Sequence, residues 1–193
     1  MKTCSISILF LVTTTMWPAC AADEFPIEPN PRFSQAANRT FKAFDPRNEQ
    51  KWQRPFFFLQ LADTQYGMFT KNQGFEQEAA LAQQAVEHIN RLRPRFVIVC
   101  GDLTNATPQH ARYQAQVAQY QQDFSRVDPE IPLVCVCGNH DIGNRPTPKS
   151  IARYQENVGD DYFSFWVGGV CNSVLNSSVL KDPSGAPKVL AAH

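Results

Sequence analysis

The chain has 193 residues, of which 43% are hydrophobic and 19% are charged, and 18 basic side chains balance 18 acidic ones to a formal net charge of zero. This size and composition are typical of a single globular domain and exclude a disordered chain. Because no run of basic residues occurs, we expect neither nucleic acid nor an anionic membrane surface as the main partner.

Residues 1–21 have the features of a secretory signal peptide. A positively charged start is followed by an apolar stretch at 6–17, and small Ala19 and Ala21 occupy the positions that a signal peptidase reads. A membrane anchor is the alternative interpretation of this stretch. No later segment approaches the roughly 20 apolar residues that a spanning helix needs. We therefore expect a secreted protein without stable membrane insertion, with a cytoplasmic protein as the alternative.

Three Asn-x-Ser/Thr triplets, at Asn38, Asn105 and Asn176, fit that compartment and predict a glycoprotein.

The segment 22–52 is rich in Pro, Asn, Arg and Phe but has no periodicity. We expect an extended arm there, with regular structure beginning after Pro55.

Four cysteines follow the predicted signal peptide, and all of them lie in apolar runs: Cys100, Cys135, Cys137 and Cys171. On a strand, Cys135 and Cys137 would share a face and would be badly placed to bond each other. We interpret the cysteines as buried packing residues, while a cross-strand disulfide from Cys100 stays open.

Apolar runs predict three buried strands, at Phe56–Ala62, Phe96–Cys100 and Ile131–Cys137. Apolar residues recur at helical spacing within 75–93 and 113–127, which predicts two helices. Thr-Pro pairs indicate the start of the second helix at 107 and of a third at 147, which should end near Gly159. Two more strands are expected around Gly168-Gly169, within 162–175.

The resulting order β-α-β-α-β-α-β-β predicts an α/β domain over 53–193. We expect a parallel sheet covered by helices and extended by a β-hairpin.

Each of the first three predicted strands ends in polar residues: Asp63-Thr64-Gln65, Gly101-Asp102 and Gly138-Asn139-His140-Asp141. In open α/β sheets, ligands bind beyond the carboxyl ends of parallel strands, so these clusters should converge on one edge. Carboxylate, amide and imidazole groups suit Mg, Mn, Fe or Zn. An Asp can bridge two such cations, and a hydroxide held between them attacks phosphate esters without a covalent intermediate.

These three clusters together resemble the motifs of the calcineurin-like metallophosphoesterase superfamily, which are Asp-x-His, Gly-Asp and Gly-Asn-His-Asp/Glu. The runs FFFLQLADTQYG, FVIVCGDLTNA and YFSFWVGGV are further similar to a branch of serine/threonine phosphatases within it. The resemblance covers roughly 53–188. It implies a two-sheet sandwich flanked by helices and hydrolysis of phosphate monoesters, either in phosphorylated proteins or in small phosphoesters.

The resemblance also implies roles for individual residues. Four side chains would hold two divalent ions, with Asp102 bridging them: Asp63, Gln65, Asp102 and Asn139. His140 would act as general acid or stabilise the transition-state charge, and Asp141 would orient its ring. Gln65 stands where the superfamily usually has His, and it can ligate only through a neutral amide oxygen.

A later His and a final Gly-His-x-His also belong to the family pattern. No Gly-His-x-His occurs in the 193 residues, and the one His after His140 is the terminal His193, which we do not expect to replace the later His. We therefore expect a C-terminally truncated, N-terminal half of the fold, in which the strands at Phe56, Phe96 and Ile131 lack their covering second sheet. Two alternatives stay open: a non-catalytic or incomplete chain, and a secreted phosphodiesterase or lipid phosphoesterase on the same fold.

Overall fold

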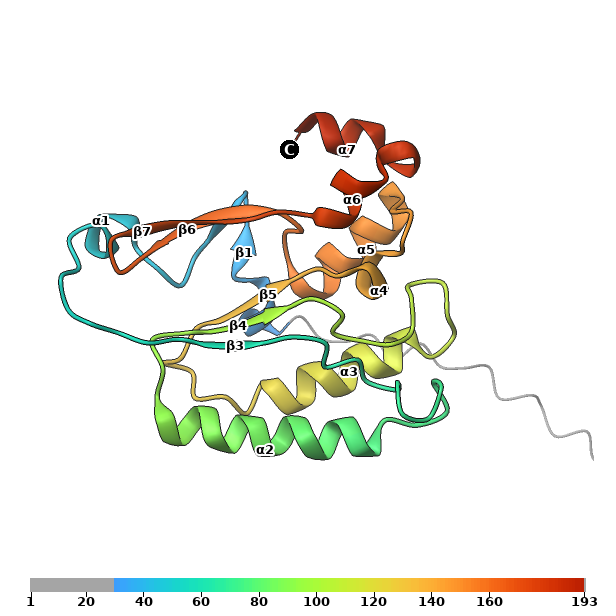
Figure 1. Ribbon diagram of the computed structural model, residues 1–193, viewed down its shortest axis with the longest axis horizontal. Coiled ribbons are helices and arrows are strands. Elements are labelled where there is room, and N and C mark those ends of the chain that lie inside the picture. The colour runs from blue at the N-terminus through green and yellow to red at the C-terminus, as the bar shows by residue number, and fades with distance from the viewer. Residues whose placement is uncertain (1–29, 193) are drawn as a thin grey trace, which may run out of the picture.

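The structure is a computed structural model and describes residues 30–192 (Figure 1). The predicted signal peptide, residues 1–21, lies outside the described residues. In the part of the chain that is described, no helix has the length and apolar character needed to cross a membrane.

A parallel sheet of three strands forms the centre of the domain, in the order β3-β4-β5. The strands are β3 (Leu59–Leu61), β4 (Val97–Cys100) and β5 (Leu133–Val136). Parallel neighbours need long crossover connections, and helices α2 (Glu76–Leu92) and α3 (Tyr113–Phe124) supply them. The predicted α/β architecture with a parallel sheet is therefore confirmed.

The other helices gather near the carboxyl ends of the strands or in the peripheral segments. They are η1 (Pro31–Ser34), α1 (Pro46–Glu49), α4 (Asn139–Ile142), α5 (Pro148–Val158), α6 (Ser177–Lys181), η2 (Pro183–Gly185) and α7 (Pro187–Ala192). The predicted cap of α5 is confirmed, because the Thr147 side chain accepts a hydrogen bond from the Ser150 N–H. Helix α3 begins at Tyr113 and not at 107. Residues 107–112 form turns instead, in which the His110 N–H donates to the Thr107 carbonyl at 2.8 Å.

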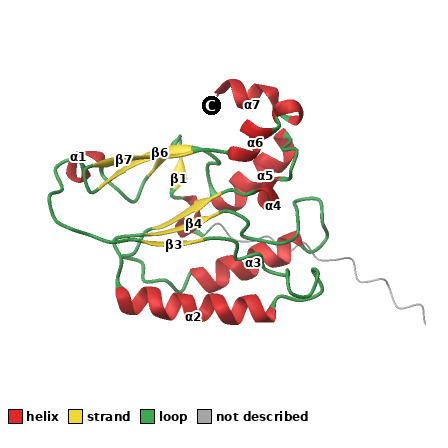
Figure 2. Cartoon of the chain, viewed as in Figure 1, coloured by secondary structure: helices red, strands yellow, loops and turns green. Residues whose placement is uncertain are grey.

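The strand β4 is buried on both faces, and its residues alternate between two cores. Val97 and Val99 pack with α2 and α3, whereas Ile98 packs with the second sheet. Figures 1 and 2 show this layering, with the two long helices on one side of β3-β4-β5 and the strands β6 and β7 on the other. A strand covered on both faces reads as a continuous apolar run, which explains why it could be predicted.

A second sheet has the order β1-β2-β6-β7. Its strands are β1 (Ala36–Ala37), β2 (Thr40–Phe41), β6 (Phe163–Val167) and β7 (Val170–Val174). The predicted hairpin is present as β6 and β7, joined through Gly168 and Gly169 at φ 59° and 83°. It belongs to this second sheet and does not extend the parallel one.

The expectation of an extended arm at 22–52 differs from the structure over its described part. There η1, β1, β2 and α1 pack into the domain, and Phe41 and Phe44 are buried. Strands β1 and β2 have two residues each, and β2 pairs with β6 through Thr40 and Ser164. Such strands carry no periodicity of their own and depend on a partner far along the chain.

The expectation that the strands lack a covering second sheet is wrong for the strands at Phe96 and Ile131, because Phe96 and Val134 are buried in the core that the second sheet forms. Phe96 packs against the second sheet through edge-on contacts with Phe44 and Phe165. Phe56 differs, because it belongs to an exposed run in which Phe57 and Phe58 are 50% and 48% exposed.

The cysteines at 135 and 137 are packing residues, as predicted. Both thiols are buried and unbridged, and burial raises the pKa of Cys135 to about 12. Cys100 is half-buried at the end of β4. Cys171 is exposed on β7, so the expectation of a buried packing residue is wrong there. No disulfide joins the cysteines of the described chain.

Candidate active site

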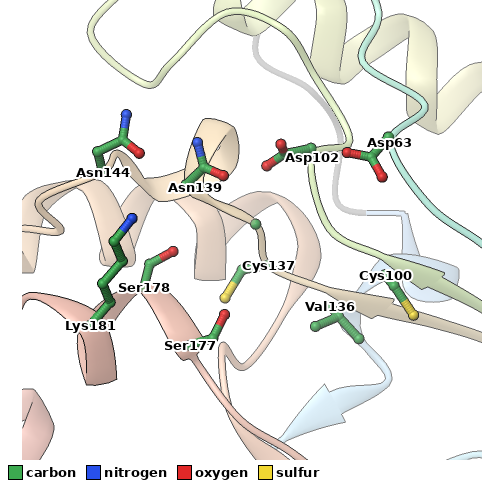
Figure 3. Close-up of a pocket in the computed structure, with 11 residues that line it drawn as sticks. Asp63, Cys100, Asp102, Val136, Cys137, Asn139, Asn144, Ser177, Ser178 and Lys181 are labelled. Atoms are coloured by element: carbon green, nitrogen blue, oxygen red, sulfur yellow. The ribbon is translucent and has the colours of Figure 1, made fainter.

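A pocket of about 520 Å³ lies at the carboxyl ends of β3, β4 and β5 (Figure 3). Its walls come from all three strand ends, from the segment after α4 and from α6: Asp63, Cys100, Asp102, Val136, Cys137, Gly138, Asn139, Asn144, Ser177, Ser178 and Lys181. Three of the predicted metal ligands, Asp63, Asp102 and Asn139, therefore share one cavity. The strand ends therefore converge on one edge of the sheet, as predicted.

Two glycines let the loops after β4 and β5 touch. Gly101 has φ 79°, and a Cβ there would lie 2.8 Å from the Gly138 Cα. A Cβ on Gly138 would lie 2.1 Å from Asp102 Oδ1. Only residues without a side chain permit this approach. The glycines of the second and third strand-end clusters thus let Asp102 lie against the Gly-Asn-His-Asp segment.

The backbone is strained at three of the predicted ligands. Asp63, Gln65 and Asp102 have φ of 54°, 35° and 49°, in the left-handed region that residues other than glycine rarely adopt. Such residues persist where the surrounding structure enforces them, and they cluster at functional sites. Here the Asp63 N–H donates to the Gly101 carbonyl at 3.1 Å, and the Gln65 N–H donates to the Asp102 carbonyl at 2.9 Å.

Asp102 is held on one oxygen and free of protein hydrogen bonds on the other. Its Oδ1 accepts from the His140 backbone N–H at 2.9 Å, and no other bond to its carboxylate is found among the described residues. Figure 3 shows Asp63 and Asp102 next to each other, with Asn139 nearby at the start of α4. Their free oxygens are available to a ligand in the pocket.

Gln65 is not brought into this pocket. It lines a neighbouring hollow of about 240 Å³, together with Met68, Phe69 and Leu81, and Asp63 borders both hollows. In this structure the Gln65 side chain therefore lies apart from the group formed by Asp63, Asp102 and Asn139.

The ring of His140 is anchored by a backbone carbonyl. Its Nδ1 lies 2.6 Å from the carbonyl oxygen of Asn105. A carbonyl can only accept, so Nδ1 carries the proton and Nε2 is left for other partners. His140 is half-buried and does not line the pocket itself.

The expectation that Asp141 orients His140 is wrong. The Asp141 carboxylate accepts from the Leu103 N–H at 2.9 Å and from the Gly138 N–H at 2.7 Å, and it is buried. Burial raises its pKa to about 7, although the backbone N–H groups partly oppose the shift. Asp141 is thus a clamp between the loops after β4 and β5, and Asn105 orients the ring.

The predicted glycosylation at Asn176 is incompatible with this fold. The side chain is fully buried, its Nδ2 donates to Asp161 at 2.8 Å and its Oδ1 accepts from the Val179 N–H at 3.1 Å. A glycan on Nδ2 would have no room.

The sequence interpretation missed the residues that α6 and its neighbourhood add to the pocket: Asn144, Ser177, Ser178 and Lys181. Asn176 followed by two serines is a signal for a helix N-cap, and it does cap α6. Nothing in the linear order indicates that this short helix faces the ends of β3 and β4.

The residues of the pocket fit a divalent cation in kind. Asp63 and Asp102 offer carboxylates and Asn139 an amide oxygen, the donors that hard cations prefer. Within 30–192, however, no three His, Cys, Asp or Glu side chains lie close enough to hold a metal ion. The described residues therefore provide only part of a ligand set.

The chain is similar to known phosphoesterases. The family described as "Calcineurin-like phosphoesterase" matches residues 58–192. The chain is 46% identical over 172 residues to the "Serine/threonine-protein phosphatase CPPED1" of Bos taurus, covering 83% of the chain and 55% of that protein. The proteins of the same name from Homo sapiens and Danio rerio are 42% and 40% identical over 172 residues; the match again covers 83% of the chain, with 55% and 56% of those proteins. The chain thus spans about half the length of these relatives.

Proposed function

Because the chain belongs to the calcineurin-like phosphoesterase family, we propose that the pocket at the ends of β3, β4 and β5 is the active site of a metal-dependent phosphate monoesterase. The observation that carries the proposal is the shared cavity of Asp63, Asp102 and Asn139. These residues come from three separate strand ends, so their meeting depends on the whole sheet.

In this proposal Asp63, Asp102 and Asn139 hold divalent cations, drawn from Mn, Fe, Zn or Mg. Asp102 follows the central strand and would serve two cations, one beside Asp63 and one beside Asn139. A divalent cation bound there would supply Lewis-acid polarisation of a phosphoryl oxygen. Gln65 would join the ligands only after its side chain turned away from the neighbouring hollow.

His140 is proposed as the proton donor to the leaving oxygen. With Nδ1 committed to the Asn105 carbonyl, Nε2 is the nitrogen that can carry and release a second proton. The substrate is proposed to be a protein phosphoserine or phosphothreonine, since the relatives from three vertebrates are named serine/threonine-protein phosphatases.

The proposal includes secretion, which rests on residues 1–21 alone. Sequencing the N-terminus of the expressed protein tests it. Recovery from the medium with a new terminus near Ala22 supports secretion, whereas an intact Met1 in the cell contradicts it.

The test of the activity is hydrolysis of p-nitrophenyl phosphate and of a phosphoserine peptide with Mn²⁺. We expect Asp102→Asn to lower kcat/KM by about 100-fold or more, because the variant loses a carboxylate that would hold the cations. The matched control is Glu130→Gln, which also neutralises a carboxylate but at an exposed side chain paired with Arg93. Equal rates for the wild-type chain and Asp102→Asn would count against the proposal.

A further inference from the structure

Helix α6 adds a second kind of chemistry to the pocket. We define the α6 wall as Ser177, Ser178 and Lys181, which line the cavity together with the two carboxylates. In Figure 3 these side chains lie on the side away from Asp63, and the Lys181 ammonium extends toward Asn144. The pocket therefore has carboxylates at one end and donors with a positive charge at the other.

Ser178 presents to the pocket a hydroxyl that has no hydrogen-bond partner among the described residues. The residue as a whole is only 7% exposed, but its hydroxyl oxygen is not among the enclosed, unpartnered polar atoms of the described chain, so it is open to the cavity. No hydrogen bond to this hydroxyl is found within 30–192, and Figure 3 shows it facing the cavity. A ligand in the pocket can therefore bond it.

Lys181 has no ionic partner in the described chain. The nearest acidic residue in sequence, Asp182, accepts from the Ser184 N–H at 3.0 Å, and none of the ion pairs found involves Lys181. An ammonium at the end of a cavity attracts anions, and lysine commonly binds phosphate as a point charge.

The α6 wall is held in position by a buried polar network. Asn176 caps α6 and donates to Asp161, whose carboxylate is fully buried and also accepts from Arg39 at 3.1 Å and from Gln155 at 2.7 Å. Arg39 lies in the β1–β2 turn and Gln155 on α5. The β1–β2 turn and the segment that joins α5 to β6, which are far apart in sequence, thus fix where α6 begins, so the donors of the wall are placed before a ligand arrives.

We propose that Ser178 and Lys181 bind the terminal oxygens of the substrate phosphate and make the site select phosphate monoesters over diesters. This inference rests on the proposed function and names its substrate class. A monoester has three terminal oxygens and up to two negative charges, whereas a diester has two terminal oxygens and one charge. With cations and Asn139 on one side of the phosphate, only a monoester also presents a terminal oxygen to the α6 wall.

The first test measures the binding of inorganic phosphate by calorimetry in the presence of Mn²⁺. Lys181→Met should raise Kd about tenfold and Ser178→Ala about threefold, the effect of removing one charge-assisted or one neutral hydrogen bond. The matched control is Lys188→Met, the same change at an exposed lysine of α7 that does not line the pocket, with Kd unchanged within about twofold. An equal Kd in Lys181→Met, or no phosphate binding by the wild-type chain, overturns the inference. Thermal melts confirm folding, and Lys181→Gln repeats the test if the methionine variant does not fold.

The second test compares phenyl phosphate with diphenyl phosphate as ligands. The wild-type chain should bind the monoester at least about tenfold more tightly, and Lys181→Met should reduce that ratio to about twofold. A ratio that does not change in Lys181→Met contradicts the inference. Hydrolysis of p-nitrophenyl phosphate is measured separately. A chain without hydrolysis but with binding that depends on Lys181 refutes the proposed function alone, whereas hydrolysis with unaltered phosphate affinity in Lys181→Met refutes the inference alone.

Discussion

At the scale of single residues, Asn105 takes the role expected of Asp141, because its carbonyl orients the His140 ring. The Gly-Asn-His-Asp motif indicates a carboxylate that orients the neighbouring imidazole. In the fold, Asp141 bonds the backbone of Leu103 and Gly138, and the imidazole contacts the Asn105 carbonyl. The motif predicts where these residues lie, because it directly follows a strand. It cannot predict their partners, since those come from the loop after another strand.

The buried Asp141 makes stability depend on pH. Its pKa in the fold is about 7, above the ordinary value of 3.8, because burial disfavours the charged form. A carboxyl group whose pKa is raised in the fold makes a contribution to the free energy of unfolding that is fully present below about pH 4. This contribution is lost as the pH rises through about 7. The free energy of unfolding that is lost between these pH values is roughly 4 kcal/mol for a shift of about three pKa units.

Urea unfolding at pH 5 and pH 8, in EDTA, measures this dependence. The free energy of unfolding should be higher at pH 5, and the difference should shrink in Asp141→Asn, whose amide does not titrate. A wild-type free energy that is equal at both pH values, or an unchanged difference in Asp141→Asn, contradicts the assigned pKa.

The cysteines allow a second prediction at this scale. Burial raises the pKa of Cys135 to about 12, and the pKa of Cys137 is raised as well, so few of these thiols ionise at pH 8. Iodoacetamide should label exposed Cys171 in the native chain and reach Cys135 and Cys137 only after denaturation. Mass spectrometry of the labelled peptides checks this, and rapid native labelling of Cys135 would show that β5 is not buried.

At the scale of elements, the parallel strands and long helices could be predicted because their signals are local. Continuous apolar runs and a helical stripe mark β4, β5 and α2 within the chain itself. The strands β1 and β2 could not be predicted, since two-residue strands exist only through pairing with β6. The α6 wall was missed for the same reason, because it becomes part of the site only when Asp161 and Arg39 fix α6.

The close contact between the loops after β4 and β5 predicts the effect of a single methyl group. In Gly138→Ala the Cβ would lie 2.1 Å from Asp102 Oδ1 and 2.4 Å from the Asp102 backbone nitrogen. The loops must separate, so we expect a loss of about 1–3 kcal/mol in the free energy of unfolding, together with weaker Mn²⁺ binding. Gly74→Ala is the matched control, because its Cβ would meet only the movable end of the Glu76 side chain. Equal stability and metal affinity in the two variants would contradict the described contact.

At the scale of the whole molecule, the central sheet joins two cores. The helices α2 and α3 pack on one face and the second sheet on the other, where Phe44 stacks on Phe165 with ring centroids 5.8 Å apart. The N-terminal segment is thus part of the domain core and not an appendage. The site depends on both layers, because one places the strand ends and the other leads into α6.

Removing an aromatic ring from the second core should destabilise the whole domain. Phe44→Ala is expected to lower the free energy of unfolding by about 3–5 kcal/mol, since the side chain is buried. Phe57→Ala, at a residue that is 50% exposed, should cost far less. Chemical denaturation followed by fluorescence and by circular dichroism compares them. Equal losses for both variants would mean that the second sheet does not cover the first.

Calorimetric titration of Mn²⁺ into the metal-free chain tests the central claim most directly, namely that the ends of β3, β4 and β5 form one cation-binding phosphoesterase pocket. We predict saturable binding that weakens at least about tenfold in Asp63→Asn and in Asp102→Asn, because each removes a charged oxygen ligand. Glu130→Gln, which neutralises an exposed carboxylate outside the pocket, should bind like the wild-type chain. Identical titration curves for the wild-type chain, Asp63→Asn and Asp102→Asn would contradict the account.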